Sequence, residues 1–409
     1  MRNRKITVGQ LSAILDVSKA TVNSWAAKKI YPVHKSRNGS IFFYEKDLLD
    51  IPEVAAMANT RWKEQSKVTA ARPYTSVELF AGAGGLALGM EQAGFHHVLL
   101  NEFDHQACET LRTNRPTWNI IEGDIHDVDF TPFHNQVDLL TGGFPCQAFS
   151  YAGKGGGFND ARGTLFFELA RAAQELNPRV ILCENVKGLT SHDNGKTFRI
   201  IQNTIAEIGY TLFAPRVLRA CCYKVPQKRE RIILVAVRND LVGRGEFHYP
   251  DPFNRVLTLR DAFYKGTLYK TDVPESVGQQ YPKKKKAVME LVPEGGDWRN
   301  LPEEIAREYM GGSYHLEGGK TGMARRLALD EPSLTLTCAP AQKQTERCHP
   351  LETRPLTIRE YARIQTFPDD WSFSGDITTQ YKQIGNAVPV NMAAAIGRSL
   401  IRFLNEIEQ

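Results

Sequence analysis

One cysteine stands where a catalytic nucleophile is expected. Cys146 belongs to the run Gly142-Gly143-Phe144-Pro145-Cys146-Gln147, which directly follows the apolar run Val137–Leu140. If the apolar run is a strand, Cys146 lies on a turn at the carboxyl edge of a sheet. Helix N-termini and basic groups at such an edge lower the pKa of a thiol, and the resulting thiolate can attack an electrophile. The alternative is a buried core thiol, but the flanking glycines and proline and the hydrophilic Gln147 favour a catalytic role.

A glycine-rich turn predicts a second site, which would hold a nucleoside. Residues 78–86 read Glu-Leu-Phe-Ala-Gly-Ala-Gly-Gly-Leu, and they end an apolar run and open a helical pattern. Glycines there let the backbone approach a ligand closely, and the helix N-terminus offers free N–H groups. Glu102 and Asp124 close two later apolar runs, where one carboxylate can hold ribose hydroxyls and the other can accept from an adenine amino group. No lysine follows the glycines as a P-loop requires, so the pattern predicts a nucleoside rather than a triphosphate.

These residues need a sheet that brings the ends of several strands together. From Tyr74 onward, short apolar runs alternate with helical periods. The runs are Ser76–Phe80, Val98–Asn101, Val137–Leu140, Val180–Cys183 and Ile232–Val237. Such alternation predicts an α/β fold, a doubly wound and mostly parallel sheet with helices on both faces. Ligands bind such sheets at the carboxyl ends of the strands, which is where the motifs above fall.

The first 50 residues have a different pattern. Val8, Leu11 and Ile14 share one face of a predicted helix, and Ser18 is a good N-cap for a second helix, from Lys19 to Lys28. Two short helices joined by a tight turn, followed by the strand-like run 41–44, resemble the winged helix-turn-helix of MerR and excisionase proteins. A small helical protein-interaction module is the alternative.

The charge of the chain is concentrated in its first part. Residues 1–75 hold 13 Lys and Arg against 6 Asp and Glu, whereas the other residues hold 38 against 40. A basic module on a nearly neutral body predicts a polyanionic partner for that module, and a merely solvated basic surface is the alternative.

Length and composition favour a cytosolic protein of several domains. A chain of 409 residues fits two or three domains. No run approaches 18 consecutive apolar residues, so no membrane-spanning helix is expected. Seven cysteines without framework spacing argue against a secreted disulfide scaffold. We expect a winged helix-turn-helix at 1–50, a linker at 51–73, a catalytic domain at 74–240, an irregular smaller domain at 241–353, and a return to the catalytic domain at 354–409.

Several motifs together resemble the cytosine-C5 DNA methyltransferase family. They occur in the family's order: Phe80–Gly85, Gly143–Gln147, Glu184–Val186, Gln227–Arg231 and Gln383–Asn386. The likeness runs from Thr75 to the C-terminus, apart from the variable region 241–353. It implies the Rossmann-like fold of methyltransferases that use S-adenosylmethionine, with 241–353 as the target-recognition domain. It also implies transfer of a methyl group to carbon 5 of cytosine.

The resemblance implies a role for each matching residue. Cys146 would attack carbon 6 of cytosine, Glu184 would contact ring N3, Arg231 would bind O2, and Arg229 would lie close to the thiol. The cofactor would be held by Phe80, Gly82, Gly84, Gly85, Leu86, Glu102, Phe103, Asp124, Ile125, Pro145, Leu165, Asn386 and Val388. DNA would be contacted by Gln147, Ser150, Lys154 and Arg162. No metal site is expected.

The partners follow from this interpretation. We expect double-stranded DNA as substrate, a monomer acting on it in the nucleoid, and modification that protects DNA from a cognate restriction enzyme. Residues 1–50 would bind operator DNA and repress the gene of the methyltransferase itself. Two alternatives remain open: methylation of cytosine in RNA, and a transcription regulator built on the helix-turn-helix.

Overall fold

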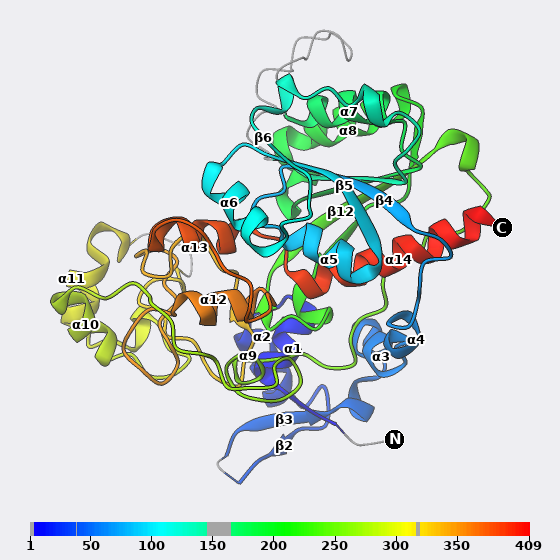
Figure 1. The fold of residues 1–409 in the computed structure, drawn as a ribbon. Coiled ribbons are helices and arrows are strands. Elements are labelled where there is room, and N and C mark those ends of the chain that lie inside the picture. Colours follow the sequence, from blue (N-terminus) through cyan, green and yellow to red (C-terminus); the bar gives the residue numbers. More distant parts are fainter. Residues whose placement is uncertain (1–3, 38, 145–164, 316–319) are drawn as a thin grey trace.

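An eight-stranded sheet organises the body of the protein (Figure 1). In this computed structural model the described residues are 4–37, 39–144, 165–315 and 320–409. The strands of the sheet are β4 (Tyr74–Leu79), β5 (Phe95–Glu102), β6 (Ile120–Glu122), β7 (Leu139–Gly143), β8 (Val180–Val186), β9 (Tyr210–Leu212), β10 (Arg216–Arg219) and β12 (Glu230–Arg238). They follow the order β10-β12-β8-β7-β4-β5-β6, with β9 paired to β12.

Most of the sheet is parallel, as predicted. Strands β4 to β8 run parallel to one another, and β12 joins β8 antiparallel. Each of the five predicted apolar runs falls on one of these strands, although β7 starts two residues after Val137 and extends to Gly143. The parallel strands therefore end at one edge, where the motif residues gather.

Helices cover both faces of the sheet (Figure 1). One face is packed by α5 (Gly85–Ala93) and α14 (Val390–Glu408), and the other by α7 (Leu165–Leu176) and α8 (Lys196–Glu207). Helix α6 (His105–Asn114) follows β5. The predicted α/β fold, with a mostly parallel central sheet, is thereby confirmed.

Small residues bring α5 and α14 into close contact. A Cβ atom at Gly397 would lie 2.6 Å from the Cβ of Ala93, and one at Gly89 would overlap Ala393. By length and composition alone, the helical stretch Ile377–Glu408 is apolar enough to cross a membrane, but 83% of its most apolar window is buried inside the protein. The larger part of this stretch is α14, a core helix that covers one face of the sheet.

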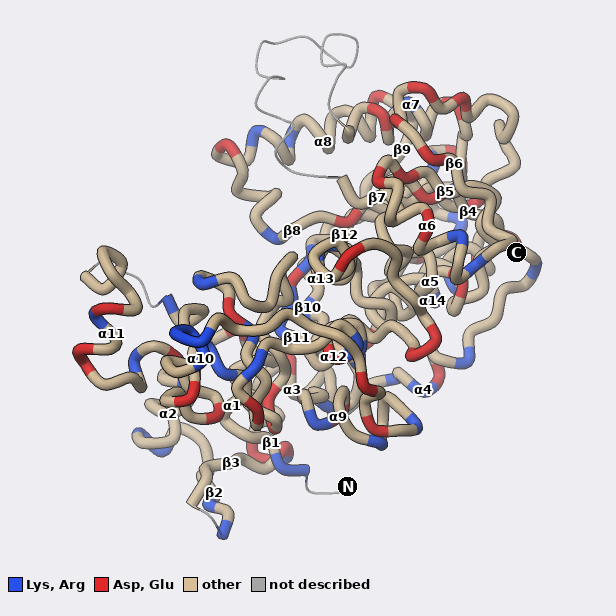
Figure 2. The backbone as a smooth tube through the Cα atoms, turned by 60° about the vertical axis from the view of Figure 1, so that its left-hand side comes forward, with Lys and Arg blue, Asp and Glu red and all other residues tan. Residues whose placement is uncertain are grey.

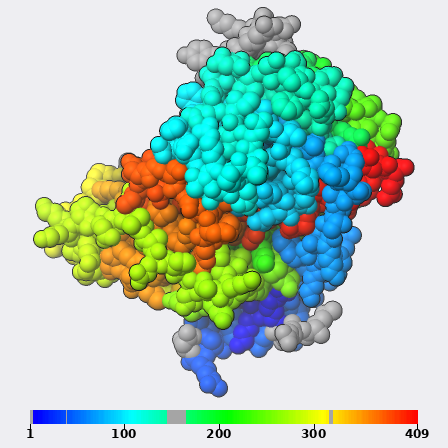
Figure 3. All heavy atoms as spheres, in the orientation of Figure 1, coloured from blue at the N-terminus to red at the C-terminus, as the bar shows by residue number. Residues whose placement is uncertain are grey.

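The N-terminal segment forms a small unit at the lower end of the molecule (Figures 1 and 3). Its elements are β1 (Lys5–Thr7), α1 (Val8–Leu15), α2 (Lys19–Ala27), β2 (His34–Lys35) and β3 (Ile41–Tyr44). Ser18 caps α2 by accepting from the Thr21 N–H at 3.0 Å, as the sequence predicts. The following helices are α3 (Pro52–Ala58) and α4 (Trp62–Gln65). Val54 and Met57 of α3 join the core of this unit, so part of the expected linker packs with it.

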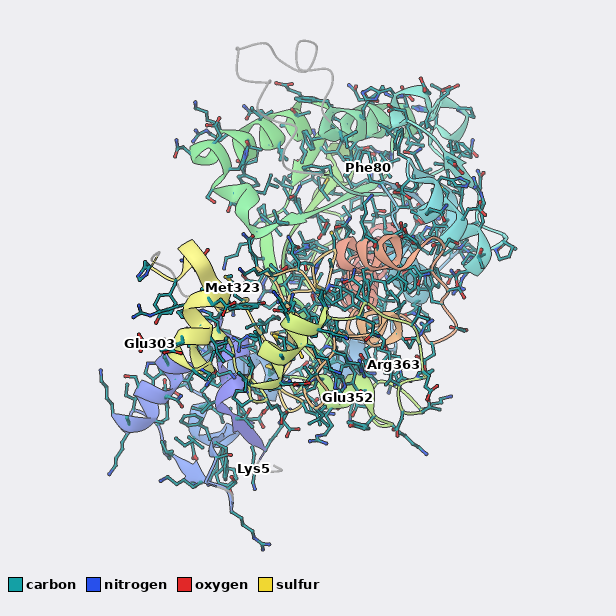
Figure 4. All side chains as sticks on the ribbon, turned by 90° about the vertical axis from the view of Figure 1, so that its left-hand side faces the viewer. Lys5, Phe80, Glu303, Met323, Glu352 and Arg363 are labelled. Atoms are coloured by element: carbon teal, nitrogen blue, oxygen red, sulfur yellow. The ribbon has the colours of Figure 1, made fainter. Side chains whose placement is uncertain are left out.

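Short helices and one short strand are separated by irregular segments in the described part of region 241–353. It contains α9 (Leu259–Phe263), α10 (Lys283–Glu290), α11 (Glu303–Met310) and β13 (Ser333–Leu334), which pairs with β11 (Gln227–Lys228). Met289, Leu301 and Ala306 belong to a small core of their own, whereas α9 packs with α12 (Ile358–Ile364) and α13 (Ile377–Asn386). In Figure 4, Glu303 and Met323 of this region lie at a distance from Phe80, which marks the sheet.

Candidate active site

A cleft of about 860 Å³ opens at the carboxyl ends of β4, β5, β7 and β8. Its far wall comes from residues 335–338 and 382–388. Ten of the predicted site residues line it: Phe80, Gly82, Gly85, Leu86, Glu102, Glu184, Arg229, Arg231, Asn386 and Val388. Sequence motifs separated by some 300 residues along the chain thus meet in one place.

Two charged side chains face each other in this cleft. Arg231 Nε lies 2.6 Å from Glu184 Oε1, and only 13% and 11% of the two side chains are exposed. The antiparallel register of β12 and β8 sets Arg231 opposite Val186, two residues beyond Glu184. A carboxyl group and a guanidinium held side by side can contact adjacent polar atoms of one planar base, such as N3 and O2 of cytosine.

The strand before Cys146 ends beside Glu184. Gly143 is the register partner of Glu184, and a Cβ at Gly143 would lie 3.1 Å from Glu184 Oε2. Asn185 Nδ2 donates to the carbonyl oxygen of Phe144 at 2.7 Å and so fixes the backbone as it leaves the strand. Cys146 lies two residues further on. Cys146 and the other predicted residues of this segment lie outside the described residues: Pro145, Gln147, Ser150, Lys154 and Arg162.

Arg229 serves as a brace between two parts of the chain. Its guanidinium is 2% exposed and donates to the carbonyl oxygens of Gly385 at 3.1 Å and Asn386 at 3.3 Å. Burial, with the neighbouring charge of Arg231, lowers the pKa of Arg229 to about 9. The sequence indicated a neighbour of the thiol, but it gave no sign that this side chain ties β12 to the C-terminal segment.

Glu102 organises the cofactor side of the cleft. One of its carboxylate oxygens accepts from the Gly82 N–H at 2.6 Å, and the other accepts from Phe103 N and Asp104 N at 2.9 and 2.8 Å. Phe80 and Gly82 both have positive φ, +57° and +54°, so the chain turns sharply between β4 and α5. The glycine loop and the end of β5 are therefore held as one surface.

Glu78 is a cleft residue that the sequence analysis missed. It is 1% exposed, lines the cleft and accepts a hydrogen bond from Thr141 Oγ1 at 3.2 Å. Burial raises the pKa of Glu78 to about 8. An acidic residue inside an apolar strand run was the available signal, because such a residue is expensive to bury without a function.

Two of the predicted cofactor glycines also have a packing role. Gly84 does not line the cleft: a Cβ there would lie 2.7 Å from Leu111 Cδ2 and 3.1 Å from Trp371, and its φ is +82°. Gly85 lines the cleft, but a Cβ there would overlap the carbonyl oxygen of Val388. Gly84 thus allows α6 and Trp371 to pack closely, and Gly85 allows α5 to approach the C-terminal segment.

Four other predicted residues lie outside the cleft lining. Phe103 is 74% exposed, and Asp124 Oδ1 lies 2.6 Å from His126 Nδ1. Ile125 is buried in the core under α7, and Leu165 starts α7 and packs partly against the same core. Their predicted contacts with the cofactor therefore stay predictions.

Known proteins match this chain over most of its length. Residues 74–402 match the family described as C-5 cytosine-specific DNA methylase. The chain belongs to this family. The Type II methyltransferase M.Eco47II of Escherichia coli is 57% identical over 100% of this chain and 98% of its own, and M.Sau96I of Staphylococcus aureus is 44% identical over 99% and 97%. A solved methyltransferase encoded within an E. coli prophage is 24% identical, with a TM-score of 0.59 over 81% of this chain and 99% of its own, which shows the shared fold.

Membership of the family decides between the alternatives left by the sequence. The protein is a DNA (cytosine-5) methyltransferase of the type II restriction–modification kind. DNA rather than RNA is its substrate, and it is an enzyme rather than a regulator alone. Its likeness to M.Eco47II includes the N-terminal segment, which lies before the residues that match the family.

Proposed function

We propose that the cleft receives a cytosine flipped out of the duplex, with Cys146 as the nucleophile and Glu184 and Arg231 as its partners on the base. The Glu184–Arg231 pair carries this proposal, because it lies beside the strand end that leads to Cys146. The base must be flipped because a protein nucleophile cannot reach carbon 6 inside the stack. Flipping costs about a few kcal/mol of lost stacking and pairing.

The chemistry follows from the weakness of carbon 5 as a nucleophile. The Cys146 thiolate adds to carbon 6, and the electron pair moves through the ring to make carbon 5 an enamine carbon. Arg231 stabilises the charge that develops at O2, and Glu184 hydrogen-bonds to or protonates N3. Carbon 5 would then bond to the methyl group of the donor, whose sulfur would keep the electrons of the broken carbon–sulfur bond. Loss of the carbon 5 proton to solvent and release of Cys146 from carbon 6 would then restore the aromatic ring and the thiolate.

The cofactor we propose is S-adenosylmethionine, which supplies an electrophilic methyl group when bound. The donor set fits it: Glu102 offers carboxylate oxygens to ribose hydroxyls, and Glu78 can accept from an ammonium group. Asn386 and Val388 close the cleft from the C-terminal side. The exposed ring of Phe103 offers a stacking face for adenine. Asp124 and Ile125 would read the edge of that base, and Leu165 would line its pocket.

Further contacts with DNA complete the proposal. Gln147, Ser150, Lys154 and Arg162 would contact the DNA, and region 241–353 would read the target site. The enzyme would act as a monomer on DNA, in the nucleoid.

We also propose that residues 1–50 bind operator DNA as a winged helix-turn-helix. Asn23 and Ser24 are exposed on α2, and Lys35 and Arg37 are exposed in the wing that holds β2 and β3. Repression of the methyltransferase's own gene would be measured with a promoter reporter and the Cys146→Ser variant, which separates repression from methylation. Replacing Asn23 and Ser24 with Glu should abolish repression, and a reporter that responds equally to both variants would refute the regulatory role.

Bisulfite sequencing of a plasmid from a methylation-free host tests the enzymatic proposal. Wild-type protein should protect cytosines in one short motif, and the Cys146→Ser protein should leave every cytosine converted. Protection that survives in the Cys146→Ser protein would refute the covalent route.

A further inference from the structure

A second pocket, of about 360 Å³, adjoins the active-site cleft. Val186, Arg229, Arg231 and Thr335 line both the pocket and the cleft. The opposite wall is formed by the end of α1, from Ala13 and Asp16. The N-terminal unit therefore reaches to within one pocket of the Glu184–Arg231 pair.

The lining of this pocket is basic. Lys187, Arg219 and Lys228 join Arg229 and Arg231, against two carboxylates, Asp16 and Glu230. These acidic groups are already engaged. Lys187 Nζ lies 3.1 Å from Asp16 Oδ2 and 2.9 Å from Glu230 Oε2, and Arg219 Nε donates to Glu230 Oε1 at 3.2 Å.

Two of the basic groups keep unused hydrogen-bonding capacity. Arg229 Nε is buried and has no hydrogen-bond partner among the described residues. Lys228 Nζ has one partner in the described part of the chain, Ser12 Oγ of α1 at 3.4 Å, and the nearby Glu331 is paired with Lys19. A buried donor without an acceptor is costly, so an anion in the pocket would satisfy Arg229 Nε and would give Lys228 Nζ a partner of opposite charge.

The N-terminal unit is fixed in place around this pocket. Arg219 Nη1 donates to the carbonyl oxygen of Ile14 at 2.6 Å. Cys221, in the short 3₁₀ turn Ala220–Cys222, belongs to the same buried core as α1. Lys228 of β11 contacts Ser12 of α1, and Figure 2 labels both elements in the lower half of the molecule. The wall formed by α1 is thus a built part of the site.

We propose that this pocket binds a backbone phosphate of the DNA strand that carries the target cytosine, so that α1 borders the DNA path during methylation. The inference rests on the proposed function, which places the flipped base at Glu184 and Arg231. A nucleotide held there brings its flanking phosphates to the neighbouring pocket, where Lys228 supplies charge and Arg229 a buried N–H donor. The N-terminal unit then takes part in methylation itself, whether or not it also binds an operator.

The salt dependence of DNA binding tests the site. Each phosphate neutralised on duplex DNA contributes about 0.9 to the slope of log K against log salt. The Lys228→Met variant keeps the apolar stem and should lower that slope by about 0.9 on a duplex holding one methylation site. Lys63→Met, an exposed lysine of α4, is the matched control and should leave the slope unchanged.

A variant of α1 should act in the opposite direction. Asp16→Asn removes a negative charge from the pocket wall and releases Lys187, so it should tighten DNA binding several-fold at low salt. Damage to the fold would instead weaken DNA binding. A lowered melting temperature of Lys228→Met or Asp16→Asn would reveal such damage. An unchanged slope in Lys228→Met, or weaker binding by folded Asp16→Asn, would overturn the proposal.

Two further outcomes separate this proposal from others. Wild-type protein that protects no cytosine would refute the proposed function, whereas a normal methylation pattern with an unchanged Lys228→Met slope refutes the phosphate site alone. Inorganic phosphate that stabilises wild type but not Lys228→Met, with equal DNA slopes, would show an anion site that DNA does not use.

Discussion

Gly143 and Glu184 are register partners on β7 and β8, and the Glu184 carboxylate fills the space where a side chain at Gly143 would begin. The absence of a side chain at Gly143 therefore sets the position of the carboxylate in the cleft. Because parallel strands fix this pairing, the relation holds before any DNA binds.

Gly143→Ala should lower kcat roughly tenfold by displacing the Glu184 carboxylate, since the new Cβ would lie 3.1 Å from its Oε2. Cofactor affinity, measured by calorimetry, should change little. Gly142→Ala is the control: its Cβ would lie 2.7 Å from Leu169 Cδ1 in the core, so it should lower the melting temperature instead. A normal kcat in Gly143→Ala would contradict the role given to the carboxylate.

Cys146→Ser should abolish turnover and leave cofactor binding intact, because a serine hydroxyl is a far weaker nucleophile near neutral pH. Transfer of tritium-labelled methyl groups to DNA measures turnover, and calorimetry measures cofactor binding. Appreciable methylation by this variant would exclude the covalent adduct.

Arg231→Ala should lower kcat by roughly 10² to 10³, as expected for loss of a group that stabilises charge in the transition state. DNA affinity should fall much less. Arg238→Ala is a control on the same strand, because Arg238 pairs with Asp240 at the opposite end of β12. A larger loss in affinity than in kcat would assign Arg231 to DNA binding instead.

Glu78 should make stability depend on pH. Its pKa rises to about 8 on folding, so the folded state holds a proton that the unfolded chain releases at lower pH. This contribution is complete below the ordinary carboxyl pKa and is lost as the pH rises toward 8. Glu78→Gln should therefore show a smaller fall in melting temperature between pH 5 and pH 8 than wild type, and parallel curves would refute the assignment.

Local patterns in the sequence predicted most of the catalytic fold. The strand ends, the caps of α2 and the order of the motifs depend on neighbours along the chain. Strand β1 was missed because its three residues depend on pairing with the distant strand β3, where Lys5 faces Tyr44. The packing role of Gly84 against Trp371 likewise depends on a contact between distant segments.

The candidate site was predictable where chemistry demands a residue type. Glu184 and Arg231 were predicted from the resemblance of their motifs to the cytosine-C5 DNA methyltransferase family, and the structure brings the two side chains together. The brace formed by Arg229 was not predictable, since its acceptors are backbone carbonyls that carry no sequence signature. The small core of region 241–353 was not predictable either, because its residues have no regular spacing along the chain.

The close fit of α14 against α5 has a consequence for synthesis. The ribosome releases the C-terminal part of the chain after every other part of the site. This part includes residues 386 and 388, which complete the cleft, and α14, which covers one face of the sheet. A growing chain that already carries Cys146 and Glu184 still lacks the partner surface for Gly85 and Gly89. The order of translation thus delays assembly of a working enzyme until nearly all of the chain has emerged.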